Sequence, residues 1–191
     1  ICLQKKFAMQ RFANMLCVLF YSSILFMYIC GKKIASEIYH DLEQKIALLT
    51  KKPTLGAILV GNNSESLRYI GQKRKFAEKI GMHFELLHLP DDVSQELLLS
   101  YIEEWNHSPD ISGYIVQLPL PAHIDTTRII AEISPAKDVD GFHPENQGKV
   151  MIGDESGFVP CTPAGVMHIL ASEHISLSGK KVCIIGRSNI V

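Results

Sequence analysis

Lys73 is the strongest candidate for a catalytic residue in the chain, because it lies among apolar residues on a predicted helix. The spacing over residues 64–80 predicts this helix, and a rotation of about 100° per residue puts Lys73 on the arc of Tyr69, Phe76 and Ile80. An ordinary lysine there buries its methylene groups and keeps its amine in water. If the amine is partly buried instead, it suits proton transfer near neutral pH, because burial disfavours its charged form. The spacing leaves both interpretations open.

Tyr69 precedes Lys73 by one helical turn on the same face of this predicted helix. Its ring could stack on a flat ligand, or its hydroxyl could hold the amine in place. The alternative is an ordinary tyrosine at the border of the core. Tyr69 is therefore a candidate partner of Lys73, and the sequence pattern leaves that choice open too.

Gln117 ends a predicted apolar strand over residues 111–117 and is followed by the sequence LPLP at 118–121. In open α/β sheets, ligands bind beyond the carboxyl ends of the strands. A glutamine at that place can orient a substrate by hydrogen bonds, and the two prolines form a rigid wall that cannot continue a central strand. The alternative is an ordinary strand end.

Two further turns carry polar groups. Residues 137–141 (KDVDG) form a charged turn, and most such turns are solvated loops. The other spaced oxygen ligands of a calcium loop are missing, so we expect no metal site. Residues 186–188 (GRS) follow a predicted strand, and their backbone amides could meet a phosphate. An arginine and a serine after the glycine would suit the extra phosphate of NADP, although a simple tight turn explains them as well.

Helices and strands alternate along the chain, which predicts an α/β fold with a mainly parallel sheet. The long glycine- and proline-rich stretch over 137–163 is expected to be a functional loop or a domain junction. Asp92 and Gln95 are predicted to cap one helix, and Thr162 and Pro163 to begin another. The predicted helices cover residues 34–49, 64–80, 92–105, 126–133 and 162–171, and the strands cover 55–60, 84–89, 111–117 and 181–185.

The composition is that of a globular chain, with 47% apolar residues and 19 Lys and Arg against 20 Asp and Glu, for a net charge of −1. No basic block is present, so we expect no nucleic-acid partner. The five cysteines are scattered without a C-x-x-C pair, which argues against a disulfide framework or a zinc cluster. This usage is typical of a reduced, cytoplasmic chain.

Both ends of the chain are unusual. Residues 12–30 carry no charge and follow a basic flank, so they resemble a signal peptide or a short membrane span. A buried helix is a second interpretation. We favour a third, in which residues 1–27 precede the folded enzyme, with Met27 as a plausible start. The chain stops at Val191, just after the predicted strand and glycine turn, and is therefore interpreted as truncated.

Five segments in order resemble the bifunctional methylene-tetrahydrofolate dehydrogenase/methenyl-tetrahydrofolate cyclohydrolase family. Each motif is modest by itself, and their order makes chance unlikely. Where the family usually has Pro-Ala, this chain has Ser64-Glu65, so the start of the catalytic helix is expected to differ locally. The segments are residues 60–73 (VGNNSESLRYIGQK), 117–121 (QLPLP), 137–142 (KDVDGF), 160–165 (PCTPAG) and 186–191 (GRSNIV).

The resemblance implies an architecture and a cellular setting. It implies a folate-side catalytic domain over 28–150 with a three-layer, mainly parallel sheet, and the start of a truncated Rossmann-like NAD(P)-binding domain over 151–191. The family oxidises 5,10-methylenetetrahydrofolate with NADP and hydrolyses the product to 10-formyltetrahydrofolate. A cytoplasmic homodimer that acts on tetrahydrofolate derivatives is implied.

The resemblance also implies a role for each matching residue. Lys73 would be the catalytic lysine, Tyr69 the residue that stacks on the pterin, Gln117 the residue that positions the lysine, and Asp140 the carboxylate that anchors the pterin. The remaining implied contacts are Leu118, Pro119 and Leu120 with the folate, and Gly186, Arg187, Ser188 and Ile190 with the cofactor.

Three alternatives remain beside this interpretation. The chain could be a non-catalytic folate-binding fragment, because most of the cofactor domain is absent from the sequence. It could be a membrane-tethered protein that uses residues 12–30 as an anchor, or a different two-domain dehydrogenase of a small substrate. The last would not explain the motifs at 117–121 and 137–142 together.

Overall fold

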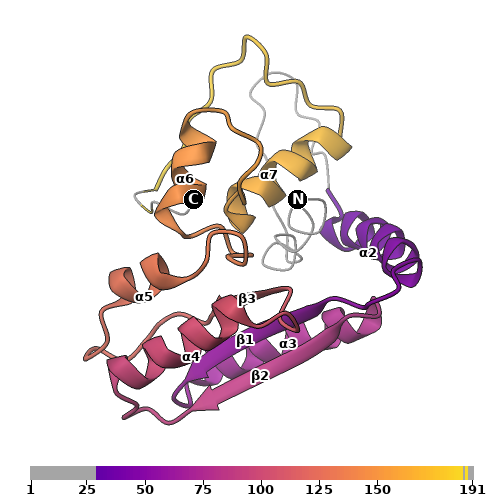
Figure 1. The fold of residues 1–191 in the computed structure, drawn as a ribbon. Coiled ribbons are helices and arrows are strands. Elements are labelled where there is room, and N and C mark those ends of the chain that lie inside the picture. Colours follow the sequence, from indigo (N-terminus) through magenta and orange to yellow (C-terminus); the bar gives the residue numbers. More distant parts are fainter. Residues whose placement is uncertain (1–28, 187, 189–191) are drawn as a thin grey trace.

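A parallel sheet forms the centre of the protein in a computed structural model, which describes residues 29–186 and 188 (Figure 1). Its three strands are β1 (Thr54–Val60), β2 (His83–Leu89) and β3 (Gly113–Val116), in the order β2-β1-β3. β1 pairs with β2 from Thr54 opposite His83 to Val60 opposite Leu89. It pairs with β3 from Leu55 opposite Gly113 to Ile58 opposite Val116. All of β1 beyond its first residue is buried, as expected for a central strand of a covered parallel sheet.

Helices cover both faces of this sheet and make the three layers that the sequence predicted (Figure 1). On one face, α2 (Gly31–Ala47) and α3 (Ser64–Lys79) pack over alternate residues of β1, among them Leu55, Ala57 and Leu59. On the other face, α4 (Gln95–His107) and α5 (Thr126–Glu132) pack over Ile58 and Val60. The alternation follows from the two-residue period of strand side chains.

Two further helices lie beyond β3, above the layered part in the view of Figure 1. These are α6 (Pro144–Met151) and α7 (Cys161–Ser172). Ile169 of α7 joins the apolar cluster of α2 and α3. α7 is therefore packed against the layered part of the protein through this cluster.

Local signals explain where α3 begins and ends. Asn63 precedes the helix, and its side-chain oxygen accepts hydrogen bonds from the N–H groups of Glu65 and Ser66, both at 3.0 Å. Gly81, with φ of +82°, lies just past its end, where the left-handed conformation favours glycine. α3 therefore ends within one residue of the end of the helix predicted over residues 64–80.

The predicted caps of two helices are wrong, and one helix was not predicted. Ser94 caps α4 in place of Asp92, because its hydroxyl reaches the N–H of Leu97 at 3.2 Å. α7 begins at Cys161, so Thr162 is not its cap, whereas Pro163 lies in the first turn as predicted, where a missing N–H is tolerated. α6 lies within the stretch that was expected to be a loop, because eight residues with a central glycine are too few to show a helical period.

The predicted strand over residues 181–185 is also wrong. Residues 181–186 are exposed and form no strand in the described part of the chain. A strand requires a neighbour to pair with, and the sheet of the described residues ends at β2 and β3.

The described residues include no helix with the length and apolar character needed to cross a bilayer. Residues 1–28 lie outside the described part of the chain, and with them nearly all of the uncharged segment over 12–30. The interpretations of that segment and the division at residues 27 and 150 stay predictions.

Candidate functional site

Lys73 and Asp140, which the sequence singled out separately, meet in the structure. Lys73 Nζ lies 3.9 Å from Asp140 Oδ2, and the two side chains are only 22% and 23% exposed. Two half-buried side chains are restrained by the packing around them, and their exposed atoms can still contact a ligand. The structure therefore brings together a proton-transfer group and a carboxylate.

The orientation of α3 puts Lys73 at the border of the core. The fully buried side of the helix carries Ser66, Ile70 and Ala77, whereas Lys73 and its neighbour Tyr69 are half-buried. The buried arc is thus shifted from the one that the sequence predicted, and it leaves both candidate residues facing its edge. Arg68 lies over the Tyr69 ring, with its guanidinium carbon 5.5 Å from the ring centre.

Asp140 reaches Lys73 because the segment before it runs beside β3. Asp138 forms a parallel bridge with Tyr114 of β3, and Val139 packs against the cluster that contains Ile70 of α3. Lys137 begins the segment, and its Nζ donates to the carbonyl oxygens of Trp105 and Ser108 at 2.7 and 2.6 Å. Burial lowers the pKa of Lys137.

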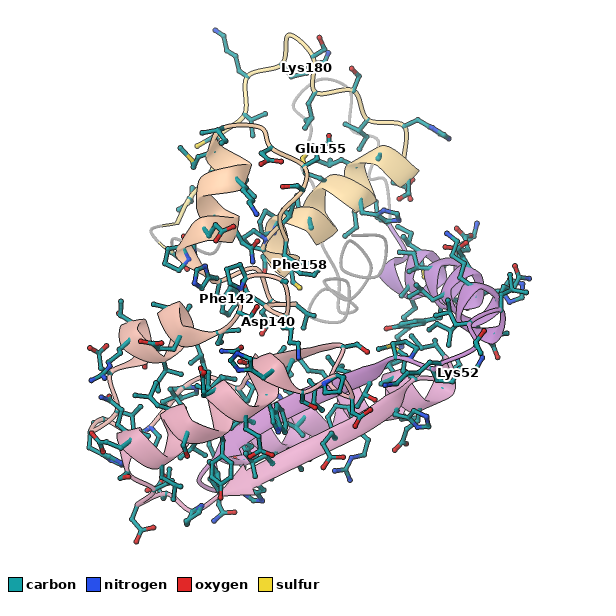
Figure 2. All side chains as sticks on the ribbon, viewed as in Figure 1. Lys52, Asp140, Phe142, Glu155, Phe158 and Lys180 are labelled. Atoms are coloured by element: carbon teal, nitrogen blue, oxygen red, sulfur yellow. The ribbon has the colours of Figure 1, made fainter. Side chains whose placement is uncertain are left out.

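The first turn of α7 closes the other side of Asp140. Cys161 Sγ donates weakly to the Val139 carbonyl oxygen at 3.6 Å and lies 3.9 Å from Asp140 Oδ1. Gly141, with φ of +70°, packs so closely that an added Cβ would lie 2.7 Å from the backbone of Val159 and Pro160. Figure 2 shows Asp140 at this junction, with Phe142 and Phe158 nearby. Asp140 is therefore held between the sheet and the start of α7.

Gly141→Ala should lower the free energy of unfolding by about 2–4 kcal/mol, because it adds left-handed strain to a backbone clash. Gly153→Ala is the matched control, since Gly153 has φ of +74° but nothing within 4 Å of an added Cβ. The control should show the strain without the clash. Urea unfolding of both variants measures the difference, and equal losses would contradict the tight packing at Gly141.

Gln117 is buried at 4% exposure, directly after β3. Its Nε2 donates to the carbonyl oxygen of Leu118 at 2.6 Å, and within the described residues its side chain makes no hydrogen bond to Lys73. Leu118 and Leu120 are half-buried and Pro119 is exposed, with a cis peptide bond between Leu118 and Pro119. The role of Gln117 toward the lysine stays a prediction.

The predicted cofactor residues are only partly described. Gly186 and Ser188 are exposed, in a stretch without helix or strand. Among the described residues beyond its chain neighbours, nothing lies within 4 Å of a Cβ added at Gly186. Arg187 and Ile190 lie outside the described residues. Their assignment to a cofactor stays a prediction.

The sequence matches a family model that covers this site. The model, described as the tetrahydrofolate dehydrogenase/cyclohydrolase catalytic domain, matches residues 29–140 and so includes both Lys73 and Asp140. The chain belongs to this family. The NAD(P)-binding domain of the tetrahydrofolate dehydrogenase/cyclohydrolase family matches residues 160–191, so the resemblance drawn from the five motifs is confirmed.

Relatives of the tetrahydrofolate dehydrogenase/cyclohydrolase family extend further than this chain. It is 47% identical over 165 residues to the bifunctional protein FolD of Aquifex aeolicus, which covers 84% of this chain and 57% of the relative. The crystal structure of the bifunctional enzyme FolD from Campylobacter jejuni superposes with a TM-score of 0.83 at 43% identity, over 84% of this chain and 58% of that one. The chain spans little more than half the length of these relatives.

A third relative was solved with ligands. The Trypanosoma brucei methylenetetrahydrofolate dehydrogenase-cyclohydrolase, described as complexed with NADP cofactor and inhibitor, has a TM-score of 0.80 at 34% identity, over 84% of this chain and 56% of that one. The α/β fold of this chain is therefore the fold of the family, and the part that matches the NAD(P)-binding domain is residues 160–191.

Sequence reasoning gave no role to two buried polar residues near the site, Asp138 and Asn146, which are 2% and 1% exposed. A signal for the helix that carries Asn146 was present. His143 caps α6, Pro144 takes its first position, and Glu145 pairs with Lys149 one turn later. No comparable signal in the sequence indicates the burial of Asn146.

Proposed function

We propose that this chain is the folate-side part of an enzyme that oxidises 5,10-methylenetetrahydrofolate with NADP and hydrolyses the methenyl product to 10-formyltetrahydrofolate. The observation that carries the proposal is the half-buried pair of Lys73 Nζ and Asp140 Oδ2, 3.9 Å apart, in a chain of this family. The chain spans only part of its relatives, so the activity of the whole protein is part of the proposal.

Lys73 would serve the hydrolysis. Water adds to the carbon that bridges N5 and N10 of the methenyl cation and gives up one proton, which leaves a hydroxyl on that carbon. When the bond from this carbon to N5 breaks, the hydroxyl proton passes to N5, and the product carries a formyl group on N10 and a hydrogen on N5. A neutral Lys73 amine can take the proton, whereas an ammonium would repel the cation. The half-buried position at the edge of α3 supports this role, because it leaves the amine within reach of a ligand.

Asp140 would anchor the pterin by accepting hydrogen bonds from its N–H groups. Tyr69 would stack on the pterin at the edge of α3. The other proposed folate contacts are Gln117, Leu118, Pro119 and Leu120, which follow β3.

NADP would be held at the glycine turn of residues 186–188, with Ile190 beside it. The surroundings of Gly186 support this use, because no described residue beyond its chain neighbours lies within 4 Å of a Cβ added there. When bound, NADP accepts the hydride from the methylene bridge. The folate side would contribute alignment, since the oxidation requires the bridge to be held at a fixed place rather than acid–base help.

The setting that we propose is a cytoplasmic homodimer, without nucleic acid or membrane as partners. The balanced charge of the chain supports the first of these exclusions.

Separate titrations of this chain with 5-formyltetrahydrofolate, a stable reduced folate, and with NADP test the proposal, followed by an assay of methenyl-tetrahydrofolate hydrolysis. The full proposal predicts binding of both ligands and hydrolysis. Folate binding without NADP binding or hydrolysis would favour the alternative of a non-catalytic folate-binding fragment. Failure to bind the reduced folate would contradict both.

A further inference from the structure

Asn146 of α6 is buried at 1% exposure, and its amide joins α6 to two other parts of the chain, residues 135–138 and Phe158. Its Nδ2 donates to the carbonyl oxygen of Pro135 at 3.0 Å and to Asp138 Oδ2 at 2.9 Å. Its Oδ1 accepts from the N–H of Phe158 at 3.0 Å. A buried amide that lacks a hydrogen-bond partner destabilises the folded protein. These three bonds therefore hold α6, residues 135–138 and Phe158 in place relative to one another.

Asp138 is the second buried polar group of this arrangement, at 2% exposure. Besides Asn146, its Oδ2 accepts from the N–H of His143 at 2.8 Å. Its backbone is bridged to Tyr114 of β3. We refer to the side chains of Asn146 and Asp138, with their partners Pro135, His143 and Phe158, as the Asn146 clasp.

The Asn146 clasp is connected to Asp140 from two directions. Along the chain, Asp138 is separated from Asp140 by a single residue, so fixing one restricts the other. Through space, the segment that begins at Phe158 continues to Val159 and Pro160. Gly141 packs against these two residues so closely that a Cβ added to it would lie 2.7 Å from their backbone. It ends at Cys161, whose Sγ is 3.9 Å from Asp140 Oδ1. Figure 2 shows Phe158 and Asp140 on the same side of the α6–α7 region.

We propose that Asn146 is a positioning residue that holds the Asp140 carboxylate in place beside the Lys73 amine. It touches neither the lysine nor a ligand and acts through Asp140. The consequence for folate binding rests on the proposed function, whereas the consequence for the Lys73–Asp140 pair does not.

A purely structural role for Asn146 would give a different pattern of effects. If Asn146 only stabilised α6, its loss would add to the loss of Asp140, because the two changes would be independent. If Asn146 acts through Asp140, its loss should matter little once Asp140 is gone. Double-variant measurements therefore separate the two.

The first measurement is the affinity for 5-formyltetrahydrofolate of wild type, Asn146→Ala, Asp140→Ala and the double variant. Asn146→Ala should weaken binding about tenfold, the scale of a lost buried hydrogen bond. The double variant should bind no more weakly than Asp140→Ala. Glu145→Gln is the control, since Glu145 is on the same helix, is exposed, and forms an ion pair with Lys149 through its side chain. Additive losses in the double variant would overturn the proposal.

The second measurement needs no folate and is the rate at which an amine-acylating reagent labels Lys73, followed by peptide mass spectrometry. Lys51, an exposed lysine that pairs with Asp110 and forms no hydrogen bond or ion pair with Lys73 or Asp140 among the described residues, is the internal reference. Loss of Asp140 should change Lys73 labelling severalfold, Asn146→Ala should change it in the same direction, and the double variant should add nothing. An unchanged Lys73 rate in Asn146→Ala would overturn the proposal, even if the chain does not bind folate.

Gly157→Ala provides a second variant in case Asn146→Ala does not fold. An added Cβ at Gly157 would lie 2.8 Å from Lys149 Cδ and 3.1 Å from Asn146 Oδ1, so it crowds the amide without removing it. It should shift Lys73 labelling in the direction of Asp140→Ala, and no shift in a folded Gly157→Ala would contradict the proposal. Failed folate binding by wild type with a coupled labelling response would reject the proposed function and keep the Asn146 clasp.

Discussion

Lys73→Met should reduce hydrolysis of methenyl-tetrahydrofolate by at least about 100-fold, the scale of a lost general base, while folate affinity stays within a fewfold of wild type. Methionine keeps most of the length and apolar character of the lysine, so its packing at the edge of α3 should survive. The measurement is the decay of methenyl absorbance in single turnovers, together with a folate titration.

Lys75→Met is the matched control for this result. Lys75 lies on the same helix and is exposed, so its loss changes the net charge equally without touching the site. The control should hydrolyse the methenyl compound as wild type does. Full turnover by Lys73→Met would reject the assignment of Lys73.

Asp140→Ala should weaken binding of 5-formyltetrahydrofolate about 10- to 100-fold, because a charged carboxylate that accepts hydrogen bonds from the pterin is removed. Calorimetric titration measures this change. Since the anchor acts on binding, affinity should suffer more than the rate constant of bound substrate.

Asp110→Ala is the control, as Asp110 is an exposed carboxylate paired with Lys51 away from the site. It loses the same charge and should bind folate normally. If Asp140→Ala kept wild-type affinity, the carboxylate would not be the pterin anchor.

The layered fold could be predicted because its signals are local and repeated. The continuous buried run of β1, the Asn63 cap of α3 and the Gly81 turn all follow from residue types at short spacing. The helical period also put Lys73 near the core. The pairing of Lys73 with Asp140 could not be predicted from spacing, because Asp140 reaches α3 only through the bridge of Asp138 to β3. The resemblance to the family supplied that residue.

Features that depend on tertiary contacts were missed or wrong. Gln95 was predicted as a cap, but its side-chain oxygen accepts from the N–H of Asp125 at 2.7 Å. The burial of Asn146 could not be predicted, because a polar residue in a short helix is ordinarily exposed. Its amide is satisfied by Pro135 and Phe158, which are 11 and 12 residues away in the sequence. The strand predicted over 181–185 has an apolar pattern without a described neighbour to pair with.

The most direct test of the central claim is a crystal structure of this chain with 5-formyltetrahydrofolate. The claim predicts the pterin ring against Tyr69, its N–H groups on the carboxylate of Asp140, and the amine of Lys73 facing the atoms between N5 and N10. A reduced folate bound elsewhere, with Lys73 and Asp140 still paired to each other, would contradict it.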